Sequence, residues 1–132
     1  MHRIAKLAAV VLTVALITGC VCPLKTRPPG QAVASENHFE NGLKQYEMGH
    51  YKQAIHQFEK AVQKDPTNFK AYYYLGMSHG AEGLYKTGLG FLYKALNLVP
   101  QGNTWMNRIQ HDIQVLTQEQ EKNKGKGKDK DK

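Results

Sequence analysis

A fixed spacing of 34 residues is the feature of this sequence that most constrains its fold. Identical residues recur at that spacing in five pairs: Gly42 and Gly76, Gly49 and Gly83, Tyr51 and Tyr85, Ala61 and Ala95, Pro66 and Pro100. A period of roughly 20–50 residues is typical of solenoid proteins, in which each repeat is one supersecondary unit that packs on its neighbours. The central part of the 132-residue chain is therefore predicted to be a short stack of repeats.

Each repeat has the apolar pattern of two helices. Apolar residues recur at spacings of three and four in the second half of the first repeat, on one side of a predicted helix: Ala54, Ile55, Phe58, Ala61 and Val62. The second repeat has an equivalent stripe: Leu84, Leu89, Leu92, Ala95 and Leu96. Gly49 permits a tight turn between the two helices of the first repeat, and Pro66 ends the second of them. The predicted fold class is all-α.

These residues resemble the tetratricopeptide repeat (TPR), a helix–turn–helix unit with this period. With the first repeat at residues 35–68, the matching residues are Gly42, Gly49, Tyr51, Ala54, Phe58, Ala61 and Pro66. With the second at 69–102, they are Tyr72, Leu75, Gly76, Gly83, Tyr85, Ala95 and Pro100. The resemblance implies an α–α superhelix that binds other proteins.

Two features lie outside the pattern of two complete repeats. Gly88 stands where the family has Ala, and Gly88 and Gly90 each cost a helix about 1 kcal/mol relative to Ala. That helix is therefore expected to be looser, or a neighbouring helix crosses it closely. Residues 103–120 continue the frame for one more helix, with Ile109 and Ile113 on its apolar side, and are predicted to be the capping helix of a TPR domain spanning 35–121.

The resemblance also implies a concave groove lined by the first helix of each unit. The groove positions hold Glu36, Phe39, Leu43, Tyr46 and Glu47, then Lys70, Tyr73, Met77, Gly80 and Ala81, and on the third helix Thr104, Asn107, His111, Gln114 and Val115. The predicted partner-binding patch is its apolar and aromatic part: Phe39, Leu43, Tyr46, Tyr73 and Met77. Aromatic residues and Met are enriched at interfaces, so an apolar or helical partner segment is expected. The alternative is that these side chains pack on each other or on the preceding segment.

The N-terminus has the features of an export signal. Arg3 and Lys6 precede an apolar stretch at residues 7–17, which is shorter than the roughly 20 residues that span a bilayer. The stretch Ile17–Cys20, "ITGC", resembles the lipobox of bacterial lipoproteins. That resemblance implies a signal peptide at 1–19, acylation of Cys20 and, because Val21 rather than Asp follows, an outer-membrane location facing the periplasm. The alternative is an ordinary signal peptide or anchor with an incidental Cys; the role of Cys22 stays open.

Positive charge is concentrated at the two ends of the chain. The net charge is +7, but residues 35–121 hold eight Lys or Arg against nine Asp or Glu, which argues against a nucleic-acid groove. Residues 20–34 are rich in Pro and are predicted to be an irregular tether. Residues 122–132 hold six Lys and no apolar side chain, and are predicted to be a disordered tail that attracts anionic lipid or polymer, or only keeps the chain soluble.

The sequence has no pattern that predicts an active site or a cofactor. The five His of the repeat region do not line one helix face or one row, and no Cys lies in that region to complete a metal site. No nucleophile–base spacing or Gly-rich phosphate loop is present. We therefore expect no enzyme activity and no cofactor. The sequence predicts a membrane-anchored scaffold or assembly factor that binds other envelope proteins, or alternatively an accessory subunit of an envelope enzyme or wall-processing complex.

Overall fold

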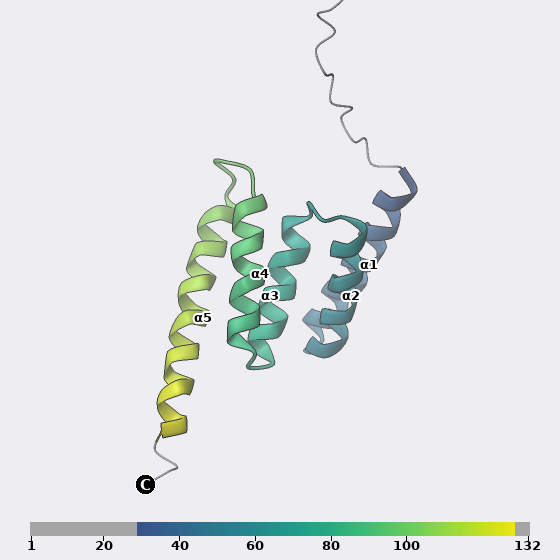
Figure 1. Ribbon diagram of the computed structural model, residues 1–132. Coiled ribbons are helices and arrows are strands. Elements are labelled where there is room, and N and C mark those ends of the chain that lie inside the picture. The colour runs from purple at the N-terminus through teal and green to yellow at the C-terminus, as the bar shows by residue number, and fades with distance from the viewer. Residues whose placement is uncertain (1–28, 129–132) are drawn as a thin grey trace, which may run out of the picture.

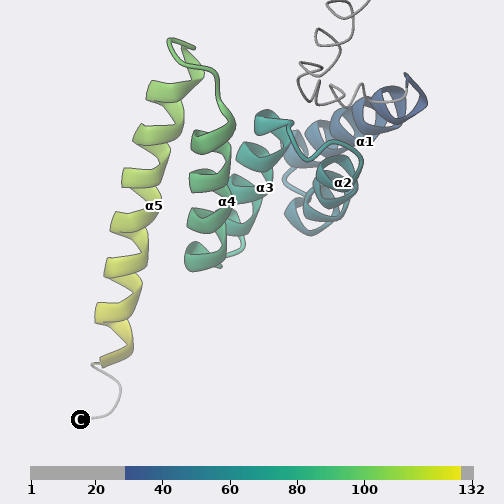
Figure 2. The same ribbon diagram turned by 45° about the horizontal axis from the view of Figure 1, so that its top comes forward.

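The computed structural model describes residues 29–128, which form five α-helices and no strand. They are α1 (Pro29–Glu47), α2 (Tyr51–Lys64), α3 (Phe69–Ala81), α4 (Tyr85–Leu98) and α5 (Trp105–Lys128). The helices alternate in direction, and each packs on the helices before and after it in the chain (Figure 1). A tilted view shows them in one row from α1 to α5 (Figure 2). The predicted all-α fold, two helix–turn–helix units followed by a capping helix, is confirmed.

Glycine in the left-handed conformation closes the turn inside each unit. Gly49 and Gly83 have φ values of 75° and 78°, which glycine adopts without steric cost. The Gly49 N–H donates to the Tyr46 carbonyl at 3.0 Å, and the Gly83 N–H donates to the Gly80 carbonyl at 3.0 Å. These bonds satisfy carbonyls at the ends of α1 and α3 that have no partner within the helix. The predicted role of Gly49 is confirmed.

In the connection between the two units, a proline follows the end of α2 and an asparagine caps the start of α3. Helix α2 ends at Lys64, two residues before Pro66. Asn68 then caps α3, because its side-chain oxygen accepts a hydrogen bond from the Ala71 N–H at 3.0 Å. Such a cap typically stabilises a helix by about 1 kcal/mol. Local sequence therefore specifies both where α2 ends and where α3 begins.

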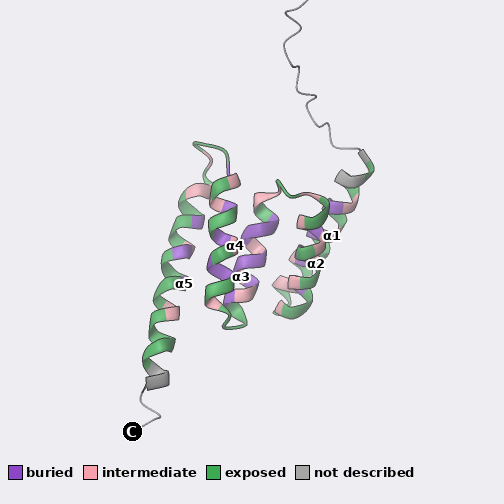
Figure 3. Cartoon of the chain, viewed as in Figure 1, coloured by how far each residue is buried: buried purple, intermediate pink, exposed green. Residues whose placement is uncertain are grey.

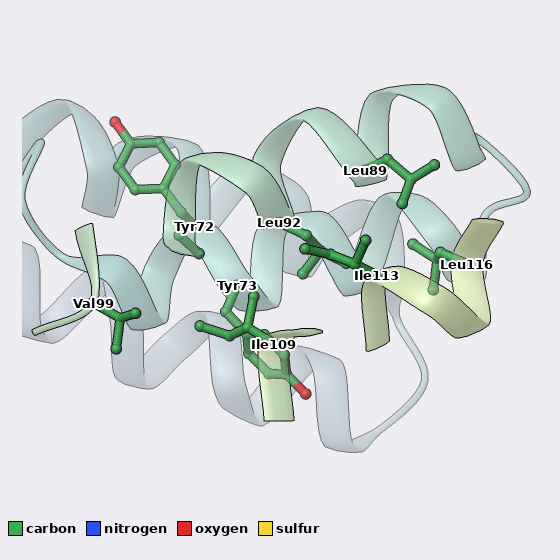
Figure 4. Close-up of a cluster of buried hydrophobic side chains, with 9 residues drawn as sticks. Tyr72, Tyr73, Leu89, Leu92, Val99, Ile109, Ile113 and Leu116 are labelled. Carbon is green, nitrogen blue, oxygen red and sulfur yellow. The ribbon is translucent and has the colours of Figure 1, made fainter. Parts of the chain in front are cut away.

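Buried residues lie on the sides of the helices that face one another (Figure 3), and their side chains form two clusters along the row. The first joins α1, α2 and α3 through Phe39, Ala54, Phe58, Ala61, Ala71 and Leu75. The second joins α3, α4 and α5 through Tyr72, Tyr73, Leu89, Leu92, Ala95, Val99, Ile109, Ile113 and Leu116 (Figure 4). The partly buried Val62, Tyr74 and Phe91 pack against both clusters. The apolar side of α5 thus completes the second cluster, as its predicted capping role requires.

Helices α3 and α4 cross closely at a pair of glycines. A Cβ atom on Gly88 would lie 2.6 Å from the carbonyl oxygen of Gly76, closer than real Cβ contacts allow. The same atom would lie 3.2 Å from Cδ2 of Leu116, which packs beside the crossing from α5. Gly90, in contrast, is exposed and has no atom near its Cβ position. Of the two explanations for the glycines of α4, close crossing is confirmed for Gly88.

The prediction of an irregular tether up to residue 34 is wrong at its C-terminal end. Helix α1 begins at Pro29, because the first position of a helix needs no N–H donor and tolerates proline. The buried Ser35 hydroxyl donates to the Ala61 carbonyl at 3.1 Å and holds this part of α1 against α2. This tertiary bond favours helix where the Pro and Gly content alone argues against it.

The prediction of disorder from residue 122 onward is wrong for residues 122–128. Helix α5 continues to Lys128, eight residues beyond the predicted end at residue 120. Lys122 pairs with Glu119 at 2.6 Å and Lys124 with Glu121 at 2.7 Å, both at a spacing of three residues. Each such pair contributes about 0.2–0.5 kcal/mol, and positive charge near a helix C-terminus adds to this. Residues 129–132 lie outside the described range.

Candidate binding face

A continuous row of aromatic rings joins α1, α3 and α5 on one side of the stack. The ring of Tyr46 lies 5.4 Å from that of Tyr74, centre to centre, and Tyr74 lies 6.3 Å from Trp105. Tyr51, at the start of α2, extends the row at 5.5 Å from Tyr46. We call this side the α1–α3–α5 face. Its exposed and half-buried side chains are Leu43, Tyr46, Lys70, Tyr74, Met77, Trp105 and Arg108.

Tyr74 is the centre of this row. Its ring stacks on Phe58 at 5.7 Å, lies at a tilt 6.0 Å from Phe39, and meets the edge of Tyr73 at 5.0 Å. Aromatic pairs in such geometries contribute about 0.5–1.5 kcal/mol each beyond the area they bury. Several pairs acting on one ring hold it in a single orientation, so the face is ordered before any partner arrives.

A polar cluster joins α3 to α5 at one end of the face. The Tyr73 hydroxyl donates to Asp112 Oδ2 at 2.7 Å and accepts a hydrogen bond from Arg108 Nε at 3.0 Å. The guanidinium of Arg108 lies 5.0 Å from the ring centre of Trp105, and Lys70 Nζ lies 5.6 Å from it. Two cations therefore flank Trp105, in the geometry of cation–π contacts.

Burial raises the pKa of the Tyr73 hydroxyl well above its usual value of 10.0, and the hydrogen bond to Asp112 raises it further. Burial also raises the pKa of Tyr46, with smaller contributions from Tyr51 and Tyr74. Both phenols are therefore neutral at ordinary pH. The charges of Arg108 and Asp112 act on the pKa of Tyr46, which places side chains of α1 and α5 within electrostatic reach of each other.

The predicted binding residues divide into two groups. Leu43, Tyr46 and Met77 are half-buried and lie on the α1–α3–α5 face. Phe39 and Tyr73, which were also predicted for the partner-binding patch, are buried instead: Phe39 is 7% and Tyr73 is 2% exposed, each inside a core cluster. Both side chains pack inside the domain, Phe39 in the first cluster and Tyr73 in the second. The predicted lipidation site, Cys20, lies outside the described residues.

Helix α5 contributes to the face as predicted, but through other residues. The predicted groove positions include Thr104, Asn107 and His111. The side chains that reach the tyrosines of α3 are Trp105, Arg108 and Asp112. Each of these lies one residue later than the predicted position. The available indication was the apolar stripe itself: Trp105, Arg108 and Asp112 immediately precede Met106, Ile109 and Ile113, and so adjoin the buried side of α5.

The described residues form neither a metal site nor a membrane span. Within residues 29–128, no three side chains of His, Cys, Asp or Glu are grouped as ligands of a metal ion. Among the five described helices, none is both long and apolar enough to cross a membrane. A shallow depression of about 380 Å³ lies away from the aromatic row, between the start of α4 and the end of α5.

Comparison with known proteins agrees with the geometry of the stack. A family model described as "TPR repeat" matches residues 42–83, from the middle of α1 through α2 and α3 to the glycine of the next turn. No curated protein was found to match the chain. The matched segment includes the turn glycines Gly49 and Gly83 and the proline stop at Pro66. The chain therefore contains TPR sequence, arranged as an α–α superhelix with a capping helix.

Proposed function

We propose that this TPR-containing chain is a non-catalytic scaffold or assembly factor of the bacterial cell envelope, which holds a segment of another envelope protein on its α1–α3–α5 face. The observation that carries the proposal is the ordered row of rings from Tyr46 through Tyr74 to Trp105, with Lys70 and Arg108 beside it. A TPR stack is in general a surface for binding peptides or proteins.

The composition of the face is that of an interface centre. Tyr, Trp, Met and Arg are enriched at protein interfaces, and Trp, Tyr and Arg are the residues that most often dominate binding energy. Here Trp105, Tyr46 and Met77 are half-buried, so each presents part of its surface while its orientation is held by neighbours. A partner that covers them loses little conformational entropy on this side of the interface, which favours affinity.

The envelope location rests on the resemblance of Ile17–Cys20 to a lipobox. Cleavage after Gly19 and acylation of Cys20 would anchor the chain in a membrane, the outer membrane if the cell has one. Several acyl chains on one residue suffice for stable anchoring, whereas one chain alone is marginal. The intact mass of the chain purified from membranes tests this step. A chain that begins at acylated Cys20 supports the anchor, and one that retains residues 1–19 or has a free Cys20 thiol contradicts it.

Binding at the face is tested with two matched substitutions. Met77→Glu places a charge in the middle of the α1–α3–α5 face, and Tyr93→Glu places the same charge on α4 at a side chain that is 51% exposed. Each variant is used to capture partners from solubilised envelopes, after circular dichroism has verified its helix content. We expect Met77→Glu to weaken capture of at least one partner by about tenfold, since hot-spot losses are typically above 1.4 kcal/mol, while Tyr93→Glu leaves it unchanged. Equal capture by both variants would contradict the proposed face.

A further inference from the structure

One edge of the stack carries exposed apolar side chains that lie outside both core clusters. Because the helices alternate in direction, the α1–α2 turn, the α3–α4 turn and the C-terminal end of α5 all lie at this edge (Figure 1). Leu84 in the second turn is 53% exposed, and Met48 in the first is 47% exposed. Among the described residues, neither belongs to a core cluster or packs against one. We call this side of the molecule the turn edge.

Leu84 has no evident role in the stability of the fold. It occupies the N-cap of α4, where its side chain makes no capping hydrogen bond. Leu is among the poorest residues at that position, and Ser, Thr, Asp or Asn would stabilise the helix. The turn at Gly83 nevertheless leaves the side chain of Leu84 exposed. Leu84 lies at the rim of the 380 Å³ depression, whose lining also includes Tyr85, Lys86 and Lys124. The sequence thus keeps an apolar group in solvent, next to lysines.

The turn edge is also rich in positive charge. Its three segments, residues 44–52, 82–86 and 119–128, hold seven Lys and four Glu, a net charge of +3. Four of these lysines follow one another at every second residue from 122 to 128, in the extension of α5. Apolar side chains framed by lysines are typical of surfaces that bind anionic bilayers, where apolar burial and attraction to lipid phosphates act together.

We propose that the turn edge docks on an anionic lipid bilayer, with Leu84 and Met48 entering the interfacial region and lysines such as Lys86 and Lys124 facing lipid headgroups. Each lysine near such a surface contributes about 1 kcal/mol, which corresponds to about fivefold in partitioning. This contact uses a different part of the molecule from the α1–α3–α5 face. The turn edge lies at the end of the stack opposite to the start of α1 (Figure 1).

Fluorescent labels at the two edges test the proposal in the full 132-residue chain. Cys20 and Cys22 are replaced by Ser, and a single Cys labelled with an environment-sensitive fluorophore is introduced as Leu84→Cys or, for the matched control, Gln101→Cys. Gln101 is exposed in the α4–α5 turn, at the opposite edge. Both labelled proteins keep the apolar stretch at residues 7–17, so any lipid contact that this stretch makes is the same in both. Vesicles of phosphatidylcholine alone and with phosphatidylglycerol therefore report which edge faces the bilayer.

The expected result is a blue-shifted label at position 84 that is quenched by spin-labelled lipid in phosphatidylglycerol vesicles, with the label at 101 still in water. Lys86→Glu and Lys124→Glu should each weaken the anionic-lipid response by at least about fivefold. Equal signals at both positions, or a deeper label at 101, would mean that the N-terminal segment alone orients the molecule, and would overturn the proposal. The same shift with soluble polyphosphate would assign the edge to polyanions instead and would overturn it as well.

Discussion

Substitution by alanine is expected to have opposite effects on stability at the two glycines of α4. Gly90 is exposed and its Cβ position is empty, so Gly90→Ala adds helix propensity without a clash. We expect it to raise the free energy of unfolding by about 1 kcal/mol. Gly88→Ala adds the same propensity, but its Cβ would lie 2.6 Å from the Gly76 carbonyl oxygen. Since that atom belongs to the backbone of α3, the two helices must move apart.

The size of the second effect follows from the cost of separating the helices. Overpacking of a tight core costs about 1–3 kcal/mol, and the lower end applies where a flexible side chain moves away. Here a backbone atom blocks the site, and Leu116 lies 3.2 Å away on another side. We take the upper part of that range and subtract the propensity gain of about 1 kcal/mol. Gly88→Ala should therefore lower the free energy of unfolding by about 1–2 kcal/mol, so that the two variants differ by about 2–3 kcal/mol.

Urea denaturation followed by far-ultraviolet circular dichroism measures both variants against the parent chain. The midpoints are comparable only if the denaturant slope is unchanged, because a changed slope would indicate loss of cooperativity between the repeats. A Gly88→Ala variant as stable as Gly90→Ala would show that α3 and α4 do not cross closely at Gly76. The proposed reason for glycine at this position would then be wrong.

Two further predictions concern pH. Tyr73→Phe removes the hydroxyl that bridges Asp112 and Arg108, and should cost about 1–2 kcal/mol at neutral pH, measured by urea denaturation. Because burial raises the pKa of Tyr73 in the folded state, the stability that its neutral hydroxyl contributes is present below pH 10.0 and is lost at higher pH. Above pH 10.0 the parent chain should therefore lose more stability than Tyr73→Phe. Equal losses in the two proteins would refute this role of the hydroxyl. The Nδ1 atom of His79 is buried and has no hydrogen-bond partner among residues 29–128, and burial lowers the pKa of His79 below 6.5. The unfolded chain then binds the proton more readily, so the free energy of unfolding should fall as pH drops from 6.5 toward about 5. The fall should be smaller in His79→Phe, which retains the stacking on Phe91. Melting temperatures that decrease equally in both proteins would contradict this role of His79.

The fold was predictable because its determinants are local and recur. Gly49, Gly83 and Pro66 act through their own backbone geometry, so a repeat spacing suffices to place turns and helix ends. The ends of the array depend on tertiary contacts. The bond from Ser35 to the Ala61 carbonyl extends α1 backward to Pro29, and no pattern within residues 29–47 indicates it.

The binding face was predictable only in part, because burial depends on which neighbour covers each ring. Tyr73 and Tyr74 are adjacent in sequence, yet Tyr73 is buried under α5, whereas Tyr74 is only half-buried and lies on the side of α1. The register of α5 decides between them, since Arg108 and Asp112 must reach the Tyr73 hydroxyl. That register is set by how Ile109 and Leu116 seat against α3 and α4, which is a property of the packed stack.

Site-specific photo-cross-linking in intact cells shows which face of the stack touches the partner. A photoreactive amino acid is placed at Met77, in the middle of the α1–α3–α5 face, and in a second protein at Tyr93 on α4. We expect a discrete protein adduct from position 77 that is absent from position 93 and that disappears when Trp105 is also replaced by Ala. The same adducts from both positions, or none from position 77 while the chain is bound in its complex, would contradict the claim that this face holds the partner.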